Sequence, residues 1–156
     1  MNDERIPQHR MPAQGGAPGP RRAVELDRAE ALRLLGSISL GRIVFSRNAL
    51  PAIRPVNHVV DEGDIIIRTH EGAAVAAHVQ QADAPGTVVA YEADVIDPAT
   101  HLGWSVVATG YARLITDPAD LARYEAMLHP WVEQQMDYAV RIHPDLVTGI
   151  RLIDAA

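Results

Sequence analysis

Two arginines are the side chains whose placement in this sequence most strongly indicates chemistry. Arg54 lies in the segment 51–60 and Arg68 in the segment 64–69, and the neighbours of both are largely apolar. An unpaired guanidinium in such surroundings would be costly. The functional interpretation is capture of a phosphate, because the arginine fork matches phosphate oxygens in a bidentate fashion. The structural alternative is an ion pair with one of the many acids of the chain, or exposure to solvent.

Groups that follow Arg68 extend this candidate anion site. Thr69 adds a hydroxyl donor, and Gly72 opens an expected helix whose first amides can face an anion. His58 and His70 are candidates for proton transfer by residue type alone, so no catalytic residue is assigned. The chain has 7 histidines, but no two stand at the i, i+4 spacing of a helical metal site, and no metal site is expected.

The elements that must position these residues are mainly short strands. The segments 40–47, 52–60 and 64–69 read as consecutive strands, with a tight turn at 61–64 between the last two. Further strands are expected at 87–96, 104–115 and 146–153. Helices are expected at 27–36, where Asp27 and Glu30 form a capping box, and at 72–81, 117–128 and 131–140. This pattern predicts an α+β fold, a six-stranded antiparallel barrel with flanking helices.

Composition narrows the possible functions. The chain has 156 residues, enough for one domain, and its 20 acidic against 14 basic residues argue against nucleic-acid binding. It has no cysteine, no apolar run of about 20 residues that could span a membrane, and no signal-peptide pattern. We therefore expect a cytoplasmic protein without a membrane partner. Residues 1–22 are rich in Pro, Gly and Gln and are expected to be a disordered tail or a partner-binding arm, with the domain at 23–156.

Several common enzyme motifs are missing. The sequence contains no Gly-x-Gly-x-x-Gly after a strand, no P-loop, no Gly-x-Ser-x-Gly and no His-Glu-x-x-His. Dinucleotide-fold dehydrogenases, P-loop NTPases, α/β-hydrolases and zincin proteases are therefore unsupported.

Five segments in order resemble the pyridoxamine 5′-phosphate oxidase-like family of FMN-binding split barrels, most closely its small actinobacterial members. The resemblance covers roughly residues 26–152. The matching segments are 40–43, 51–61, 67–72, 89–94 and 103–110.

The resemblance implies a homodimer that binds FMN in two symmetric clefts between the subunits. It implies that six consecutive residues run along the flavin, with backbone groups near its ring: Arg54, Pro55, Val56, Asn57, His58 and Val59. Arg68 and Thr69 would lie by the phosphate. Trp104 and Ser105 would come from the other subunit and cover the ring; for Trp104, a core or dimer contact is the alternative.

One position departs from the family pattern. Ala74 stands where relatives carry a phosphate-binding lysine, and Glu71 adds a negative charge nearby. Loss of one charge-assisted contact costs about 1.5–3 kcal/mol, or roughly one to two decades in affinity. The expected function is an FMN-dependent oxidoreductase that acts on an unknown small molecule and not in vitamin B6 synthesis. The alternatives are a non-catalytic protein that binds flavin, the deazaflavin F420 or haem, and a cofactor-free barrel dimer.

Overall fold

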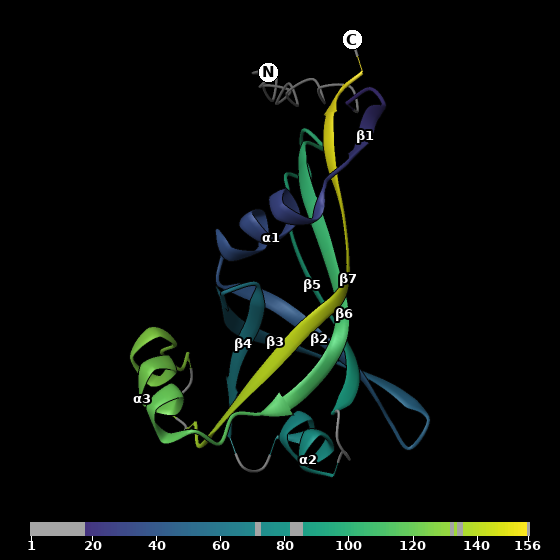
Figure 1. Cartoon of the computed structure of the whole chain (residues 1–156). Helices are drawn as coiled ribbons and strands as arrows, with labels where there is room; N and C mark the ends of the chain where they lie inside the picture. Colours follow the sequence, from purple (N-terminus) through teal and green to yellow (C-terminus); the bar gives the residue numbers. More distant parts are fainter. Residues whose placement is uncertain (1–17, 71–72, 82–85, 132, 134–135, 156) are drawn as a thin grey trace, which may run out of the picture.

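The fold is dominated by long antiparallel strands (Figure 1). The computed structural model describes residues 18–70, 73–81, 86–131, 133 and 136–155. In chain order the elements are β1 (Arg21–Glu25), α1 (Arg28–Gly36), β2 (Leu40–Arg47), β3 (Leu50–Asp61), β4 (Asp64–Thr69), α2 (Ala74–Gln80), β5 (Thr87–Ile96), β6 (Gly103–Leu114), α3 (Pro118–Met127) and β7 (Tyr138–Asp154).

Six of these strands close into a ring. The sheet order is β1-β7-β4-β3-β2-β5-β6, and an additional pairing of β7 with β6 joins the two ends around β2 to β7. Every pairing is antiparallel. Closure leaves few free strand edges within the ring. The expected α+β fold with six antiparallel barrel strands is confirmed.

The interior of the ring is aliphatic, as the alternation of side chains along each strand requires. On β5, for example, Val89, Tyr91 and Ala93 point inward and are buried, and on β6 Val106 and Ala108 face them. Helix α1 covers one opening with a buried stripe of Ala31, Leu34 and Leu35. Its N-cap Asp27 accepts the amide of Glu30 at 2.8 Å, as the capping pattern predicted.

Two strands differ from the sequence-based expectation. Residues 21–25 form β1, which pairs with the end of β7, so this strand starts two residues inside the expected tail; residues 1–17 lie outside the described residues. β7 begins at Tyr138 rather than at 146, so the expected helix over 131–140 is wrong at its C-terminal end. The alternation of outward Arg141 and His143 with inward Ile142 is a strand pattern that the helical assignment overlooked.

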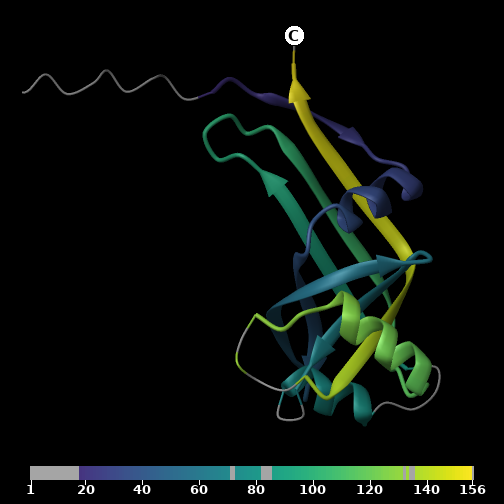
Figure 2. The ribbon, with the colours of Figure 1, turned by 90° about the vertical axis from the view of Figure 1, so that its left-hand side faces the viewer.

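The long β7 bends through an irregularity in its pairing with β6. The register shifts between Thr109 and Gly110, and a Cβ at Gly110 would lie 1.8 Å from the carbonyl oxygen of His143. Only glycine fits this approach of two backbones. Beyond the ring, β5, β6 and β7 continue upward and meet β1 in an extension (Figures 1 and 2).

Helix α3 packs on the outer surface of the ring, and α2 lies at its lower end (Figures 1 and 2). Ile66, Tyr124 and Leu128 form a small buried cluster beneath α3. The phenol of Tyr124 donates to Asp61 at 2.7 Å and accepts from Arg123 and Arg141 at 3.0 Å each.

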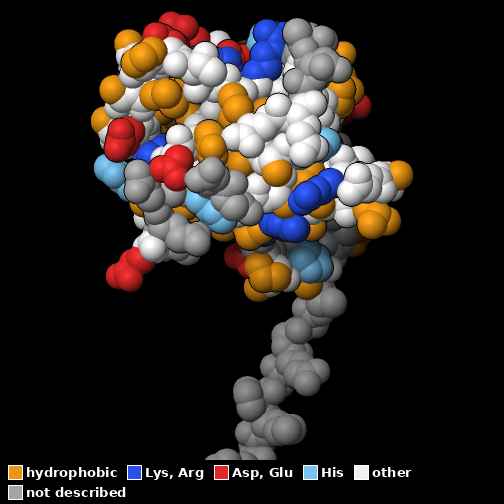
Figure 3. Space-filling model, turned by 90° about the horizontal axis from the view of Figure 1, so that it is seen from below, with side chains coloured by type: hydrophobic (Ala, Val, Ile, Leu, Met, Phe, Trp, Pro, Cys, Tyr) orange, Lys and Arg blue, Asp and Glu red, His pale blue; other side chains and the backbone are white. Residues whose placement is uncertain are grey.

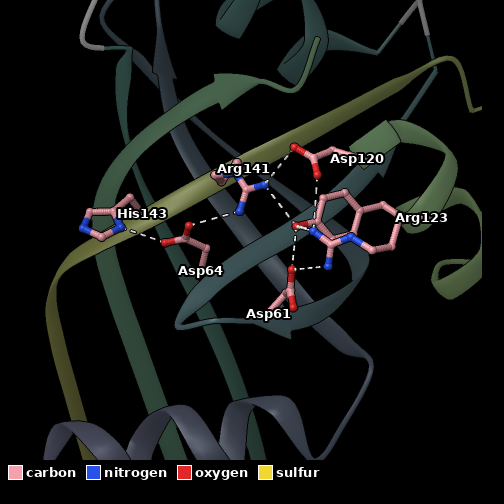
Figure 4. Close-up of polar contacts among 7 residues, drawn as sticks. Asp61, Asp64, Asp120, Arg123, Arg141 and His143 are labelled. Carbon is pink, nitrogen blue, oxygen red and sulfur yellow. Dashed lines mark hydrogen bonds and ion pairs between the residues drawn. The ribbon is translucent and has the colours of Figure 1, made fainter. Parts of the chain in front are cut away.

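The residues that bind this phenol also form ion pairs with their neighbours (Figure 4). Asp64 lies 3.1 Å from Arg141 and 2.7 Å from His143, and Arg123 also contacts Asp120 at 3.4 Å. We call these residues the α3 network: Asp61, Asp64, Asp120, Arg123, Tyr124, Arg141 and His143. Among the described helices, none is long and apolar enough to cross a membrane.

Candidate functional site

A cleft of about 540 Å³ opens between β3, the end of β4, the start of α2 and the segment before β7. It gathers six of the residues that the sequence singled out: Arg54, Pro55, Val56, Arg68, Thr69 and Ala74. It also contains four others: His70, Ala73, Val75 and Met136. We call it the main cleft.

Local chain geometry explains why these residues meet. β3 extends past the end of β4: β4 pairs with β3 only from His58 onward, which leaves Arg54 to Val56 beyond its reach. Thr69 is the last residue of β4, and three residues after His70 the chain reaches the N-cap of α2, Ala73. Ala73 provides no side-chain cap, and Gly72, which was expected to open this helix, lies outside the described residues.

The two arginines of the main cleft contact backbone carbonyls. One terminal nitrogen of Arg54 donates to the carbonyl of Ile53 at 2.8 Å. Arg68 donates to the carbonyl of Leu128 at 2.9 Å and to that of Met136 at 2.6 Å. Among the described residues, no carboxylate forms an ion pair with either arginine. The ion-pair alternative therefore does not hold among these residues, whereas the solvent-exposure alternative does hold for Arg54. Each guanidinium keeps N–H groups that a ligand could use.

The lining of the main cleft is cationic although the chain is acidic. Its described members include two arginines and His70 but no Asp or Glu, whereas the chain carries a net charge of -6. The 14 basic residues are all arginines, so no lysine anywhere in the chain can replace the one that Ala74 lacks. Figure 3 views this lower end of the molecule and shows arginine and histidine side chains among apolar ones.

Five predicted site residues point elsewhere. Asn57 donates its side-chain amide to the carbonyl of His129 at 2.8 Å, and Val59 packs against the cluster under α3. His58 is buried in the core, where its ring contacts the carbonyl of Leu35 and the hydroxyl of Tyr91.

Trp104 and Ser105 lie on opposite faces of β6. Trp104 packs in the core of its own chain and is 7% exposed, which matches the alternative stated for it. Ser105 lines a different cleft of about 390 Å³ between β1, β6 and β7, with Val107 and Thr148 among its neighbours.

Asn57 and Arg68 together hold the connection between α3 and β7. Arg68 binds the carbonyls of Leu128 and Met136, at the two ends of this connection, and Asn57 binds the carbonyl of His129. Met136 is thereby fixed as a wall of the main cleft. The sequence offers no signal for Met136, because it lies 68 residues from Arg68 and within the segment expected to be helical. His70 directly follows Thr69 and was recognised only as a possible proton-transfer group.

The part of the chain that the structure describes contains no group of three or more His, Cys, Asp or Glu side chains arranged to hold a metal ion. The chemistry available in the main cleft is therefore binding of an anion by arginine and histidine beside apolar walls.

Comparison with known proteins places the chain in a family. The model of the pyridoxamine 5′-phosphate oxidase family matches residues 27–151. The chain belongs to this family. The resemblance seen in the sequence is thus confirmed over nearly the whole folded part.

Individual relatives are consistent with this assignment. The chain is 53% identical over 145 residues to Rv0080, an uncharacterised protein of Mycobacterium tuberculosis, covering 88% of this chain and 95% of that protein. A Corynebacterium glutamicum protein assigned to the pyridoxamine 5′-phosphate oxidases is 32% identical, with a TM-score of 0.70 over 86% of this chain and 96% of that one. The FAD binding protein of Mycobacterium smegmatis is 34% identical, with a TM-score of 0.68 over 85% of this chain and 100% of that one.

Proposed function

We propose that this protein binds a flavin, FMN, in the main cleft and acts as an FMN-dependent oxidoreductase on a small molecule. The observation that carries the proposal is the pair Arg54 and Arg68, which no described carboxylate neutralises, at the rim of a cleft with apolar walls. A flavin mononucleotide has this polarity, with a dianionic phosphate at one end and a flat ring at the other. The 34% identical FAD binding protein supports a flavin rather than another anion.

In this proposal each wall of the main cleft has a distinct task. Arg54 and Arg68 bind the phosphate, because charge-assisted bonds to phosphate exceed neutral ones in strength. Pro55, Val56 and Met136 provide apolar surface for the ring and exclude water. The flavin supplies the redox chemistry, and the protein supplies orientation and electrostatics.

The affinity for the phosphate of FMN should be lower than in relatives that carry a lysine at the position of Ala74. Replacement of Ala74 by Lys would introduce the only lysine of the chain into the cleft lining. We expect Ala74→Lys to tighten FMN by about one decade or more, since such a contact contributes about 1.5–3 kcal/mol. Riboflavin lacks the phosphate and should bind both forms equally.

A flavin-fluorescence titration with FMN and riboflavin tests this. Gln80→Lys is the matched control, because it adds the same charge at an exposed position on the same helix. Tightening of FMN by Ala74→Lys alone supports the site. Equal gains for both lysine variants would indicate a general charge effect. Absence of flavin binding in every variant would reject the proposal, and the mass of any small molecule that co-purifies would then identify F420, haem or no cofactor.

We also propose that the protein is a homodimer that pairs through the outer face of β2, β3, β5, β6 and β7. One row of cross-strand neighbours on this face runs through Ile53, Val44, Ala90, Thr109 and Leu146. Its ends, Ile53 and Leu146, are 55% and 61% exposed. Val107 and Tyr111, each 38% exposed, flank this row on β6. An outer sheet face with this many apolar side chains favours a covering partner.

A second copy is the occupant that the family resemblance suggests, and Ser105 lies on the same outer face. Light scattering at micromolar concentration should give twice the chain mass of 16.9 kDa. Val107→Asp should give monomers, whereas Met127→Asp, at a somewhat more exposed site on α3, should not. A monomeric wild-type protein would reject this part of the proposal.

A further inference from the structure

A buried polar pair lies directly behind the main cleft. His58 is 1% exposed and Tyr91 is 0% exposed, and both point into the aliphatic interior of the ring. The hydroxyl of Tyr91 lies 2.5 Å from Nδ1 of His58, and the two rings meet edge to face with centroids 5.0 Å apart. Nε2 of His58 lies 2.8 Å from the carbonyl oxygen of Leu35.

These contacts determine the direction of each hydrogen bond. A carbonyl oxygen only accepts, so Nε2 of the neutral ring carries the hydrogen and donates to Leu35. Nδ1 is then an acceptor, and the phenol of Tyr91 donates to it. The hydroxyl of Tyr91 is also 3.4 Å from the carbonyl oxygen of Val56, a residue of the main cleft.

The backbone of β2 makes room for this arrangement. Gly41 is the cross-strand partner of Val56, and a Cβ at Gly41 would lie 2.4 Å from the hydroxyl oxygen of Tyr91. The phenol therefore occupies the space of a missing side chain. Its hydroxyl approaches β3 between His58, which is buried, and Val56, which lines the main cleft.

Stability alone does not account for such a pair. Polar groups in an apolar interior carry a desolvation cost that their hydrogen bonds only offset, and apolar replacements of similar size are often neutral. Directional bonds do restrict the relative positions of the elements that they join. Here they join α1 through Leu35, β3 through His58, two residues from Val56, and β5 through Tyr91.

We propose that His58 and Tyr91 are positioning residues that fix the Pro55–Val56 wall of the main cleft and thereby the place of the flavin ring. This inference rests on the proposed flavin site. It assigns neither residue a contact with the ligand. It predicts that loss of the Tyr91 hydroxyl impairs the ring end of the site and leaves the phosphate end intact.

The test compares Tyr91→Phe, His58→Leu and the double variant with wild type. Tyr91→Phe should lower the affinities for FMN and for riboflavin by the same factor. That factor should be roughly tenfold if the displaced wall costs the complex the free energy of about one hydrogen bond. The double variant should recover part of the thermal stability that Tyr91→Phe loses, because it leaves no unpaired imidazole but still removes the donor to the carbonyl of Leu35. It should not recover flavin affinity. Tyr111→Phe, which removes the same atom at an exposed site on β6, is the control, provided that light scattering gives it the mass of the wild-type protein, because Tyr111 lies on the proposed dimer face.

Hydrogen exchange provides a readout that needs no ligand. Tyr91→Phe should accelerate exchange in residues 54–57 more than elsewhere in β3, and Tyr111→Phe should not. Unchanged flavin affinity together with unchanged exchange at 54–57 would reduce the pair to a structural role and overturn the inference. If wild type binds no flavin, the proposed function fails, while the exchange experiment still decides whether the pair positions this wall.

Discussion

The main cleft and the α3 network both contain two arginines, but the partners of these arginines differ. Arg123 and Arg141 in the α3 network contact Asp61, Asp64 and Asp120 and the phenol of Tyr124. Arg54 and Arg68 in the main cleft contact only backbone carbonyls among the described residues. In the α3 network, carboxylates of the protein neutralise the arginines. In the main cleft, no described carboxylate neutralises them, so their positive charge is available to an anionic ligand.

This difference distinguishes the arginines of the α3 network from those of the main cleft, for which we propose a role in binding. Tyr124 connects the charges of the α3 network, with both guanidinium groups also packed over its ring at 4.5 and 5.5 Å. These contacts attach α3 to the turn between β3 and β4 and to β7. We therefore expect changes in the α3 network to alter stability, and changes in the main cleft to alter ligand binding.

The largest effect should follow from removing the phenol of Tyr124. Tyr124→Phe keeps the buried ring but leaves Asp61, Arg123 and Arg141 without their shared partner. Hydrogen bonds to charged groups contribute about 1.5–3 kcal/mol, so the free energy of unfolding should fall by that amount. Urea denaturation measures this, with Tyr111→Phe as a control that should change little. A fall in flavin affinity together with stability would contradict the expectation that the α3 network affects stability alone.

A smaller loss of stability is expected for Arg68→Ala, because this residue lines the main cleft and also binds two backbone carbonyls of the protein. Its two bonds hold the ends of the connection between α3 and β7, and their loss should lower the free energy of unfolding by about 1–2 kcal/mol. FMN should also bind roughly tenfold more weakly, through the lost charge. Riboflavin titration separates the causes. Weaker riboflavin binding would show that the cleft wall itself had moved.

Arg54→Ala should affect binding alone. The side chain is exposed and its described bond is to the adjacent residue Ile53, so the free energy of unfolding should change by less than about 0.5 kcal/mol. FMN affinity should fall by about tenfold and riboflavin affinity should stay constant. The same flavin-fluorescence titration measures both. A stability loss as large as that of Arg68→Ala would place Arg54 with the structural arginines.

Sequence patterns predicted most of the ring because period-2 alternation and turn residues are local signals. β2, β4 and β5 have the expected bounds, and Asp27 and Asp117 cap α1 and α3 as expected. β1 and the first half of β7 were missed because their strand character depends on partners far along the chain. β1 pairs only with the last residues of β7, a contact that no local pattern reveals.

The residues of the candidate site were predictable from the same kind of local signal. Arg54 to Val56, Arg68, Thr69 and Ala74 lie near one another in sequence on adjoining elements, and they meet in the main cleft. Asn57, His58 and Val59 follow in the same strand, but side-chain direction and the packing of α1 and α3 take them elsewhere. Met136 lines the cleft where Arg68 binds its carbonyl oxygen, a contact between residues 68 positions apart. Such contacts require knowledge of the tertiary structure.

The smallest expected effect is a difference in pH dependence between the two regions. Burial lowers the pKa of His58 below the 6.5 of a free imidazole, so the unfolded chain takes up this proton first. The stability that neutral His58 contributes is therefore complete above about pH 6.5 and decreases as the pH falls. The bonds from Tyr124 and Arg123 lower the pKa of Asp61, so its contribution is lost only when the pH falls below about 4.

Measurement of this difference must account for Glu92, which acts in the opposite direction. Burial and the nearby Asp94 raise the pKa of Glu92 to about 7, so its contribution to stability grows as the pH falls from 7 towards 4.5. Urea denaturation at several pH values should therefore be read as the difference between wild type and each variant. His58→Gln should differ from wild type by an amount that shrinks between pH 7 and 5, and Asp61→Asn by an amount that shrinks only below about pH 4. A difference that grew as the pH fell from 7 would show that the folded core holds His58 protonated, with Nδ1 then donating to the hydroxyl of Tyr91, and would overturn the assignment.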